Sequence, residues 1–220
     1  VAEHGVFLSF IGFLVFLLFG LFGSRAFMLS QTQNQMIVEY GVDYLTVVCC
    51  FSFGMYGQMI FERLMQATGR TFYTMITQGT GAIINIILDP IFILPQGYDL
   101  GLFRMPVGFN MGTQGAAIAT VIGQIVAFIL AVIINEKKNA DIRLKLREFR
   151  PNLHLIGRIY AIGFPSVIMM AIGSVMTWLM NIILITYTTG KETAATVFGV
   201  YFKLNSFVFM PVFGLNNGVI

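Results

Sequence analysis

One carboxylate lies inside a stretch of the chain that is apolar enough for lipid. Asp89 sits within the run 81–94, which contains no basic residue and is otherwise dominated by Ile, Leu and Phe. Ionisable side chains in such segments are rare, and they mark ion pathways, proton relays or substrate sites. Asp89 therefore needs either a partner or a function.

The residues next to Asp89 supply further oxygen atoms. Asn85 precedes it by four positions, which places both side chains on one face of a helix. Pro90 has no amide hydrogen and its ring crowds the carbonyl of Ile86, so we expect this carbonyl to be a free acceptor. Asp-Pro is also a common pair at helix ends, so Asp89 could instead only satisfy Asn85 or a helix end near the outer interface.

The following apolar segment can complete the cluster. If the two helices are antiparallel neighbours, Thr120 adds a hydroxyl and Ala116, one turn before it, adds a backbone carbonyl. Carboxylate, amide, hydroxyl and carbonyl oxygens are ligands for a small hard cation, and the same carboxylate could alternatively carry a proton. Either occupant would make the site respond to an ion gradient.

The composition shows what must position these residues. The chain is 57% hydrophobic and only 10% charged, whereas about a quarter of the residues of soluble domains are charged. Six segments approach the roughly 20 apolar residues that cross a bilayer as a helix: 5–23, 44–61, 72–94, 115–134, 159–186 and 194–220. They do not alternate polar with apolar residues as outer-membrane strands do. We therefore expect an all-α integral membrane protein with six transmembrane helices.

Basic residues predict its orientation, because Lys and Arg are retained on the cytoplasmic side. Two connections hold nine of the 13 basic residues: Arg63 and Arg70 in 62–71, and Lys137, Lys138, Arg143, Lys145, Arg147, Arg150 and Arg158 in 135–158. Loops 62–71 and 135–158 are therefore expected to be cytoplasmic, in a multi-pass protein of the cell (cytoplasmic) membrane. The net charge of +3 reports this topology, and no nucleic-acid partner is expected because no aromatic residues interleave with the basic stretch.

The chain divides at its longest polar stretch. Residues 1–134 would form one bundle of four transmembrane helices, 135–158 a cytoplasmic basic linker, and 159–220 the first two helices of another bundle. The chain opens at Val1 rather than Met and stops within an apolar segment, so we expect a piece of a longer protein.

Several polar and helix-breaking residues within the spans are candidates for transport roles. Polar groups avoid lipid, so the substrate cavity candidates are Tyr56, Gln58, Gln78, Gln124, Thr177, Asn181 and Lys203. Lys203 could instead extend its stem to the interface. Proline in a helix permits a bend, and the hinge candidates are Pro90, Pro165 and Pro211, although such prolines also occur in static membrane helices.

Motifs of catalysis are lacking. The sequence contains no Walker loop, dinucleotide fingerprint, nucleophile elbow or His-Glu-x-x-His helix. The adjacent Cys49 and Cys50 and the isolated His4 and His154 do not have ligand spacing. We expect no enzyme, no cofactor, and no metal other than a coupling sodium ion.

Three ordered motifs resemble the multidrug and toxic compound extrusion (MATE) transporters: Arg63-Leu-Met-Gln-Ala-Thr-Gly-Arg70, Asn85-Ile-Ile-Leu-Asp-Pro-Ile-Phe92 and Gly115-Ala-Ala-Ile-Ala-Thr120. Gly163-Phe-Pro165 and the segment 207–215 look like the seventh and eighth helices of the same family. The resemblance implies helices three to eight of a twelve-helix antiporter with two six-helix lobes, in which 1–134 belongs to the amino-terminal lobe and 159–220 begins the carboxy-terminal lobe.

By the same resemblance, Asn85, Asp89 and Thr120 match the coupling site of the amino-terminal lobe, which binds sodium or a proton together with a first-helix aspartate. That aspartate lies outside this chain. Family members that couple through the other lobe use a seventh-helix glutamate, and the span 159–186 has no acidic residue. The implied function is efflux of hydrophobic, often cationic drugs by alternating access, in a transporter that is monomeric when full length.

Two other functions stay open. A lipid-linked saccharide flippase has a related fold, but its cavity is usually richer in basic groups than these spans. A non-transporting membrane scaffold or receptor module would not need the polar cluster at 85, 89 and 120.

Overall fold

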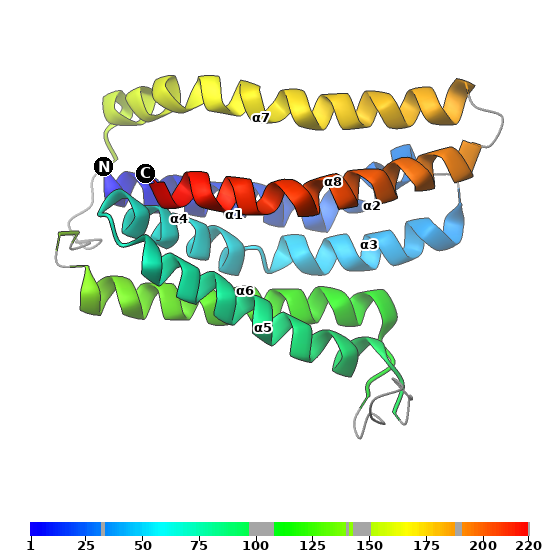
Figure 1. The fold of residues 1–220 in the computed structure, drawn as a ribbon, viewed down its shortest axis with the longest axis horizontal. Helices are drawn as coiled ribbons and strands as arrows, with labels where there is room; N and C mark the ends of the chain where they lie inside the picture. The colour runs from blue at the N-terminus through cyan, green and yellow to red at the C-terminus, as the bar shows by residue number, and fades with distance from the viewer. Residues whose placement is uncertain (32–33, 97–107, 140, 143–150, 188–190, 220) are drawn as a thin grey trace. The chain divides into compact units, whose positions relative to one another are not determined.

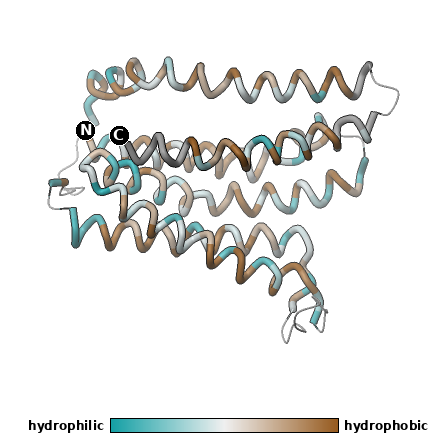
Figure 2. Tube along the Cα trace, viewed as in Figure 1, coloured by the Kyte–Doolittle hydropathy of each residue, from teal (hydrophilic) through white to brown (hydrophobic). Residues whose placement is uncertain are grey.

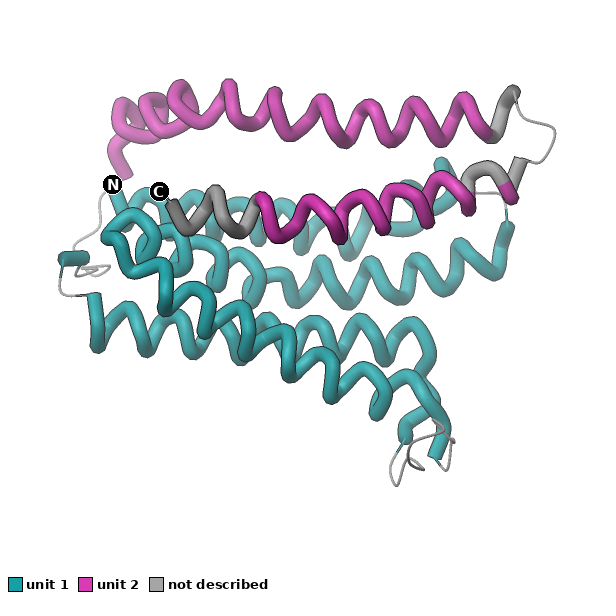
Figure 3. The backbone as a smooth tube through the Cα atoms, viewed as in Figure 1, with its two compact units in different colours: residues 1–149 teal, residues 150–220 magenta. Residues whose placement is uncertain are grey.

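The computed structural model describes residues 1–31, 34–96, 108–139, 141–142, 151–187 and 191–219 (Figure 1). The chain forms two compact units, Val1–Phe149 and Arg150–Ile220 (Figure 3). The first unit contains α1 (Ala2–Phe22), α2 (Ser24–Gln31), α3 (Gln35–Cys50), α4 (Phe53–Ala67), α5 (Thr71–Ile93) and α6 (Gly112–Lys138). The second contains α7 (Leu153–Tyr187) and α8 (Lys191–Val219).

The helices confirm an all-α membrane protein. Among the described residues, α1, α5, α6 and α7 are each long and apolar enough to cross a bilayer, and α3 with α4 makes a fifth candidate if the bent pair is one span. Hydrophobic residues recur along the length of these helices (Figure 2). The sixth predicted span, 194–220, falls in α8, whose apolar stretch Thr196–Val212 is shorter than the other candidates.

The second predicted span differs most from expectation. Instead of one straight helix over 44–61, α3 and α4 meet at a bend of 50° around Phe51 and Ser52. The hydroxyl of Ser52 donates to the carbonyl of Cys49 (2.8 Å), so the break does not leave this backbone acceptor unpaired. The helix then continues to Ala67, and only three residues, 68–70, separate it from α5. Most of the predicted loop 62–71 is therefore helical.

The connection between α6 and α7 is also shorter than the predicted linker 135–158. α6 runs to Lys138 and α7 begins at Leu153. Residues 140 and 143–150, which carry much of the basic charge of this stretch, lie outside the described residues.

The core of the first unit is built on α6, which contacts α3, α4 and α5. Small residues permit this, because Ala117, Ala119, Ala127 and Ala131 of α6 are fully buried. A Cβ on Gly123 would lie 2.9 Å from the carbonyl oxygen of Gly81 in α5. Backbones in membrane bundles approach closely where such residues face each other.

The connection between α5 and α6 fixes how these two helices align. Backbone amides of Phe109, Asn110 and Met111 donate to the carbonyls of Ile91, Leu94 and Phe92, at 2.9–3.1 Å. Asn110 and Gly112 have φ values of 52° and 55°, which let the chain reverse into α6. The last turn of α5 is thereby tied to the first turn of α6, close to Asp89.

The three prolines proposed as hinges lie inside helices, Pro90 in α5, Pro165 in α7 and Pro211 in α8. Each helix continues past its proline. Their role in bending during transport stays a prediction.

Candidate functional site

α5 and α6 bring the predicted coupling residues together. Asn85 lies opposite Thr120 across the helix interface, with the side-chain amide 3.2 Å from the hydroxyl oxygen. The amide is also 2.9 Å from Oδ2 of Asp89, one turn further along α5. The hydroxyl of Thr120 donates to the carbonyl of Ala116 at 2.9 Å. All four residues chosen from the sequence thus belong to one cluster.

The amide of Asn85 bridges Asp89 and Thr120. Its Nδ2 donates to Oδ2 of Asp89 (2.9 Å), and its Oδ1 accepts from the backbone amide of Thr120 (3.2 Å). In the opposite orientation Nδ2 would face that backbone N–H and the amide oxygen would face the carboxylate, and neither pair forms a hydrogen bond. The contacts with Asp89 and Thr120 therefore fix the orientation of Asn85.

The other oxygen of Asp89 has no partner. Oδ1 is buried and makes no hydrogen bond, although buried acceptors are nearly always paired and an unpaired one costs about 1–3 kcal/mol. The carboxylate thus has a free coordinating position within reach of the Asn85 and Thr120 side chains. A small cation or a proton can satisfy it.

Next to this cluster lies a cavity of about 250 Å³ that we call the amide hollow. It is lined by α4, α5 and α6 through Gln58, Gln78, Gly81, Ala82, Asn85, Thr120, Gly123 and Gln124. Three of the predicted cavity candidates, Gln58, Gln78 and Gln124, therefore line one space together with Asn85 and Thr120. Oε1 of Gln124 is buried without a hydrogen-bond partner.

A second carboxylate, Glu62, borders the same region and was not among the sequence candidates. It lies in α4 and is only 6% exposed. Its Oε1 accepts from Nε2 of Gln58 (2.8 Å) and from the hydroxyl of Thr77 (2.9 Å), and its Oε2 accepts from Nε2 of Gln78 (2.8 Å). The sequence interpretation placed residue 62 in a loop because Arg63 follows it. The available signal was Gln58, one turn earlier on the same helix face.

Tyr56, another cavity candidate, faces a different space. It lines an apolar cavity of about 400 Å³ between α1, α4 and α6, the aromatic hollow, formed by Val6, Ser9, Phe10, Phe13, Phe53, Tyr56, Gly57, Ile60, Phe61 and Phe128. Its ring packs on Phe16 with centroids 5.7 Å apart. This space offers apolar and aromatic surface rather than ion ligands.

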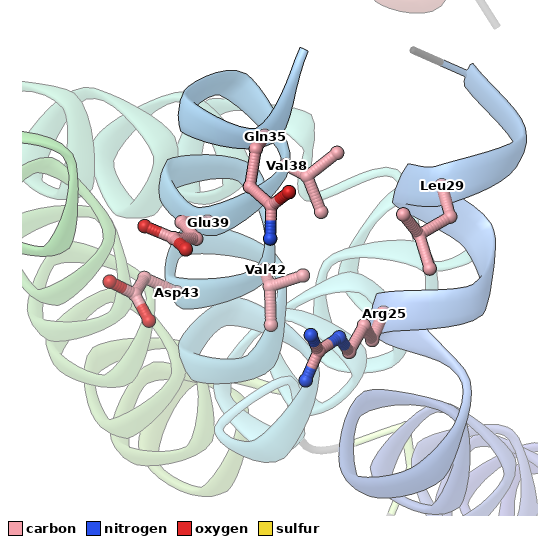
Figure 4. A pocket seen from close by; sticks show the side chains of 7 residues that line it. All are labelled: Arg25, Leu29, Gln35, Val38, Glu39, Val42 and Asp43. Carbon is pink, nitrogen blue, oxygen red and sulfur yellow. The ribbon is translucent and has the colours of Figure 1, made fainter. Parts of the chain in front are cut away.

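A third cavity, of about 360 Å³, lies between α2 and α3 and carries charges (Figure 4). Glu39 and Asp43 extend from one side of α3, whereas Arg25 extends from α2 toward Val42 (Figure 4). Glu39, Asp43 and Arg25 are all exposed, and no ion pair within 4.0 Å joins them. We regard this as a solvated surface.

The remaining candidates lie in the second unit. Thr177 is partly buried and donates to the carbonyl of Gly173 (3.0 Å). Asn181 is partly buried, and Lys203 is exposed on α8. Among the residues that the structure describes, no group of three or more His, Cys, Asp or Glu side chains could hold a metal ion.

The comparisons with known proteins agree with the motifs. Residues 1–91 match the model of the MatE family. The multidrug export protein MepA of Staphylococcus haemolyticus is 27% identical over 183 residues, covering 83% of this chain and 37% of the relative. The proteins of the same name from Staphylococcus saprophyticus and Staphylococcus aureus are 28% and 27% identical over 161 residues, 73% of this chain and 32% of each relative.

The chain thus spans about a third of the length of the relatives it matches. No solved structure matches it. The family match covers α1 to α4 and most of α5, including Asn85 and Asp89, and the relatives extend over most of the chain. On these grounds residues 1–91 of the chain are similar to the MatE family.

Proposed function

We propose that this chain is part of a cation- or proton-coupled multidrug efflux antiporter of the cell membrane, which exports hydrophobic, often cationic compounds by alternating access. The relatives are named multidrug export proteins. In this proposal, 1–134 belongs to the amino-terminal lobe, 135–158 is a cytoplasmic linker and 159–220 begins the second lobe.

The observation that carries the proposal is the unpartnered oxygen of Asp89. Oδ1 is buried without a donor, while Oδ2 accepts a hydrogen bond from the side-chain amide of Asn85. Binding of a cation or proton satisfies Oδ1, and its departure leaves the acceptor unpaired again. The free energy of the helix packing around Asp89 then depends on occupancy, which is what coupling to an ion gradient requires.

The chemistry of the amide hollow does not suit the binding of a lipid phosphate. Its lining carries amide and hydroxyl groups and no Lys or Arg. A saccharide flippase must bind a lipid phosphate, for which basic side chains are the usual ligands. Gln58, Gln78 and Gln124 instead present neutral dipoles.

The test is ion-driven efflux of a fluorescent organic cation from proteoliposomes that contain the intact transporter. Wild type should expel the dye when a sodium or a proton gradient is imposed, and the active gradient identifies the coupling ion. Asp89→Asn should reduce gradient-driven efflux at least about tenfold, because the amide keeps the shape but not the charge. Asp43→Asn, an exposed aspartate of α3, should behave as wild type. Undiminished coupling in Asp89→Asn would refute the proposal.

A further inference from the structure

Glu62 has the surroundings of a second ion site. Among the described residues it is the one carboxylate that is buried, at 6% exposure. It lies on the last two turns of α4, next to the three-residue turn that leads into α5. Intramembrane carboxylates in such positions are retained for function more often than for packing, because hydrophobic residues would pack at lower cost.

The carboxylate of Glu62 is hydrogen-bonded but has no basic partner. Its three donors, from Gln58, Thr77 and Gln78, are all neutral. The only ion pair found between described side chains joins Arg70 to Asp141 (3.0 Å), so no basic group of this part of the chain pairs with Glu62. A carboxylate without a basic partner attracts a cation.

Two of those donors connect Glu62 to the amide hollow. Gln58 and Gln78 bind Glu62 and also line the hollow, whose other lining residues include Asn85 and Thr120. Gln78 and Asn85 are seven residues apart on α5, roughly 10 Å along the helix axis. The hollow therefore lies between Glu62 and the neighbours of Asp89.

The free polar atoms around the hollow are acceptors. The side-chain nitrogens of Gln58 and Gln78 already donate to Glu62. Oε1 of Gln124 and Oδ1 of Asp89 are buried without any donor. The hollow is lined by the unpaired amide oxygen of Gln124, and each of the two carboxylates contacts a residue of its lining. Such oxygen ligands suit a hard cation and disfavour an anion.

The size of the hollow selects between a metal ion and a drug. The hollow has a volume of about 250 Å³, which exceeds the roughly 10–15 Å³ that one water molecule requires by this measure. Pockets for drug-sized ligands usually begin near 300 Å³ and are mostly apolar. The amide hollow is thus adequate for a small cation with part of its water shell.

We propose that Glu62 and the amide hollow form a second binding site for a monovalent metal cation, which receives the ion that leaves Asp89 and passes it toward the α4–α5 turn. The direction of this transfer rests on the proposed coupling role of Asp89. The existence of the second site does not, since it follows from the buried charge, the acceptors and the volume.

The test is equilibrium binding of radioactive sodium to the purified intact transporter. Wild type should bind one sodium ion more than Glu62→Gln, which is two against one where Asp89 also binds sodium, and one against none where Asp89 carries a proton. Glu136→Gln, an exposed glutamate of α6, should bind sodium as wild type does. No sodium binding in wild type, or equal stoichiometry and affinity in wild type and Glu62→Gln, would overturn the proposal. If wild type binds the ion that Glu62→Gln loses but shows no gradient-driven efflux, the antiporter function fails and the second site stands.

A further variant guards against misfolding of Glu62→Gln. Gln124→Met removes the unpaired acceptor without touching any hydrogen bond of Glu62. The sodium affinity of the Glu62 site should fall about tenfold, the usual effect of losing a supporting ligand, and any other sodium site should be unchanged. Sodium binding of wild-type affinity in Gln124→Met would contradict the assignment, whatever the fate of Glu62→Gln.

Discussion

The two carboxylates beside the amide hollow are held in opposite ways. Glu62 receives three hydrogen bonds from neutral donors on two helices, whereas Asp89 contacts one amide and keeps Oδ1 without a partner. The hydrogen bonds of Glu62 link α4 to α5 whether or not an ion is present. Oδ1 of Asp89 gains a partner only when a ligand binds. The comparison separates an anchored charge from one whose environment changes with occupancy.

The sharpest way to break this comparison is to remove each acid in turn. Glu62→Leu leaves the side-chain amides of Gln58 and Gln78 without their acceptor, whereas Thr77 can still donate to the carbonyl of Thr74 (2.8 Å). The variant should lower the free energy of unfolding by roughly 2–4 kcal/mol. Asp89→Leu, which removes an unpaired oxygen together with one hydrogen bond, should cost no more than about 1 kcal/mol. Thermal unfolding of the purified intact transporter in detergent measures both. Equal losses for the two variants would show that the acids are not held differently.

The second prediction concerns the close contact between α5 and α6 beside the amide hollow. Gly123→Ala places a methyl group 2.9 Å from the carbonyl oxygen of Gly81, so the α5 and α6 backbones must separate. We expect a loss of about 1–3 kcal/mol and weaker sodium binding. Gly79→Ala is the matched control, because a Cβ there meets nothing within 4 Å. Comparable unfolding midpoints for the two variants would exclude tight α5–α6 packing as the cause.

A smaller effect should follow from removing the hydroxyl of Thr120, which belongs to the cluster around Asp89. Thr120→Val deletes a group that contacts Asn85 and donates to the carbonyl of Ala116. If the variant loses about 1 kcal/mol of cation-binding free energy, the cation concentration that gives half-maximal efflux should rise roughly fivefold. Thr80→Val removes the equivalent bond to the carbonyl of Ile76 on α5 and lies outside the cluster. Its cation dependence should stay at the wild-type value, and a matching shift there would point to a general helix effect.

The smallest effect is expected in the aromatic hollow. Tyr56→Phe keeps the ring that packs on Phe16 and removes only a hydroxyl, so stability should change by less than about 0.5 kcal/mol. Sodium binding should be unaltered. A large change in sodium affinity would mean that the aromatic hollow and the amide hollow are not independent.

Much of this arrangement follows from residue patterns. Long apolar runs predict the helices, because a bilayer offers no partner for an unpaired backbone. The spacing of Asn85 and Asp89 predicts their shared face, and their proximity to Thr120 follows once α5 and α6 are antiparallel. These inferences need only helix periodicity and a short connection.

Glu62 could not be identified in that way. Its charge and the neighbouring Arg63 resemble a cytoplasmic loop, and its burial depends on Thr77 and Gln78 of the next helix. The bend at Phe51 and Ser52 was not predicted either, since neither residue is Pro or Gly. Both features arise from contacts between segments, which local patterns do not encode.

The same bend bears on how the protein enters the bilayer. α3 and α4 have 16 and 15 residues, and each falls short of the roughly 20 that cross the hydrocarbon layer alone. During biosynthesis neither half is a complete insertion signal, so the two must be integrated as one unit with the help of neighbouring spans. Because Glu62 lies in the second half, its burial is completed only when α5 has been synthesised and delivers Thr77 and Gln78.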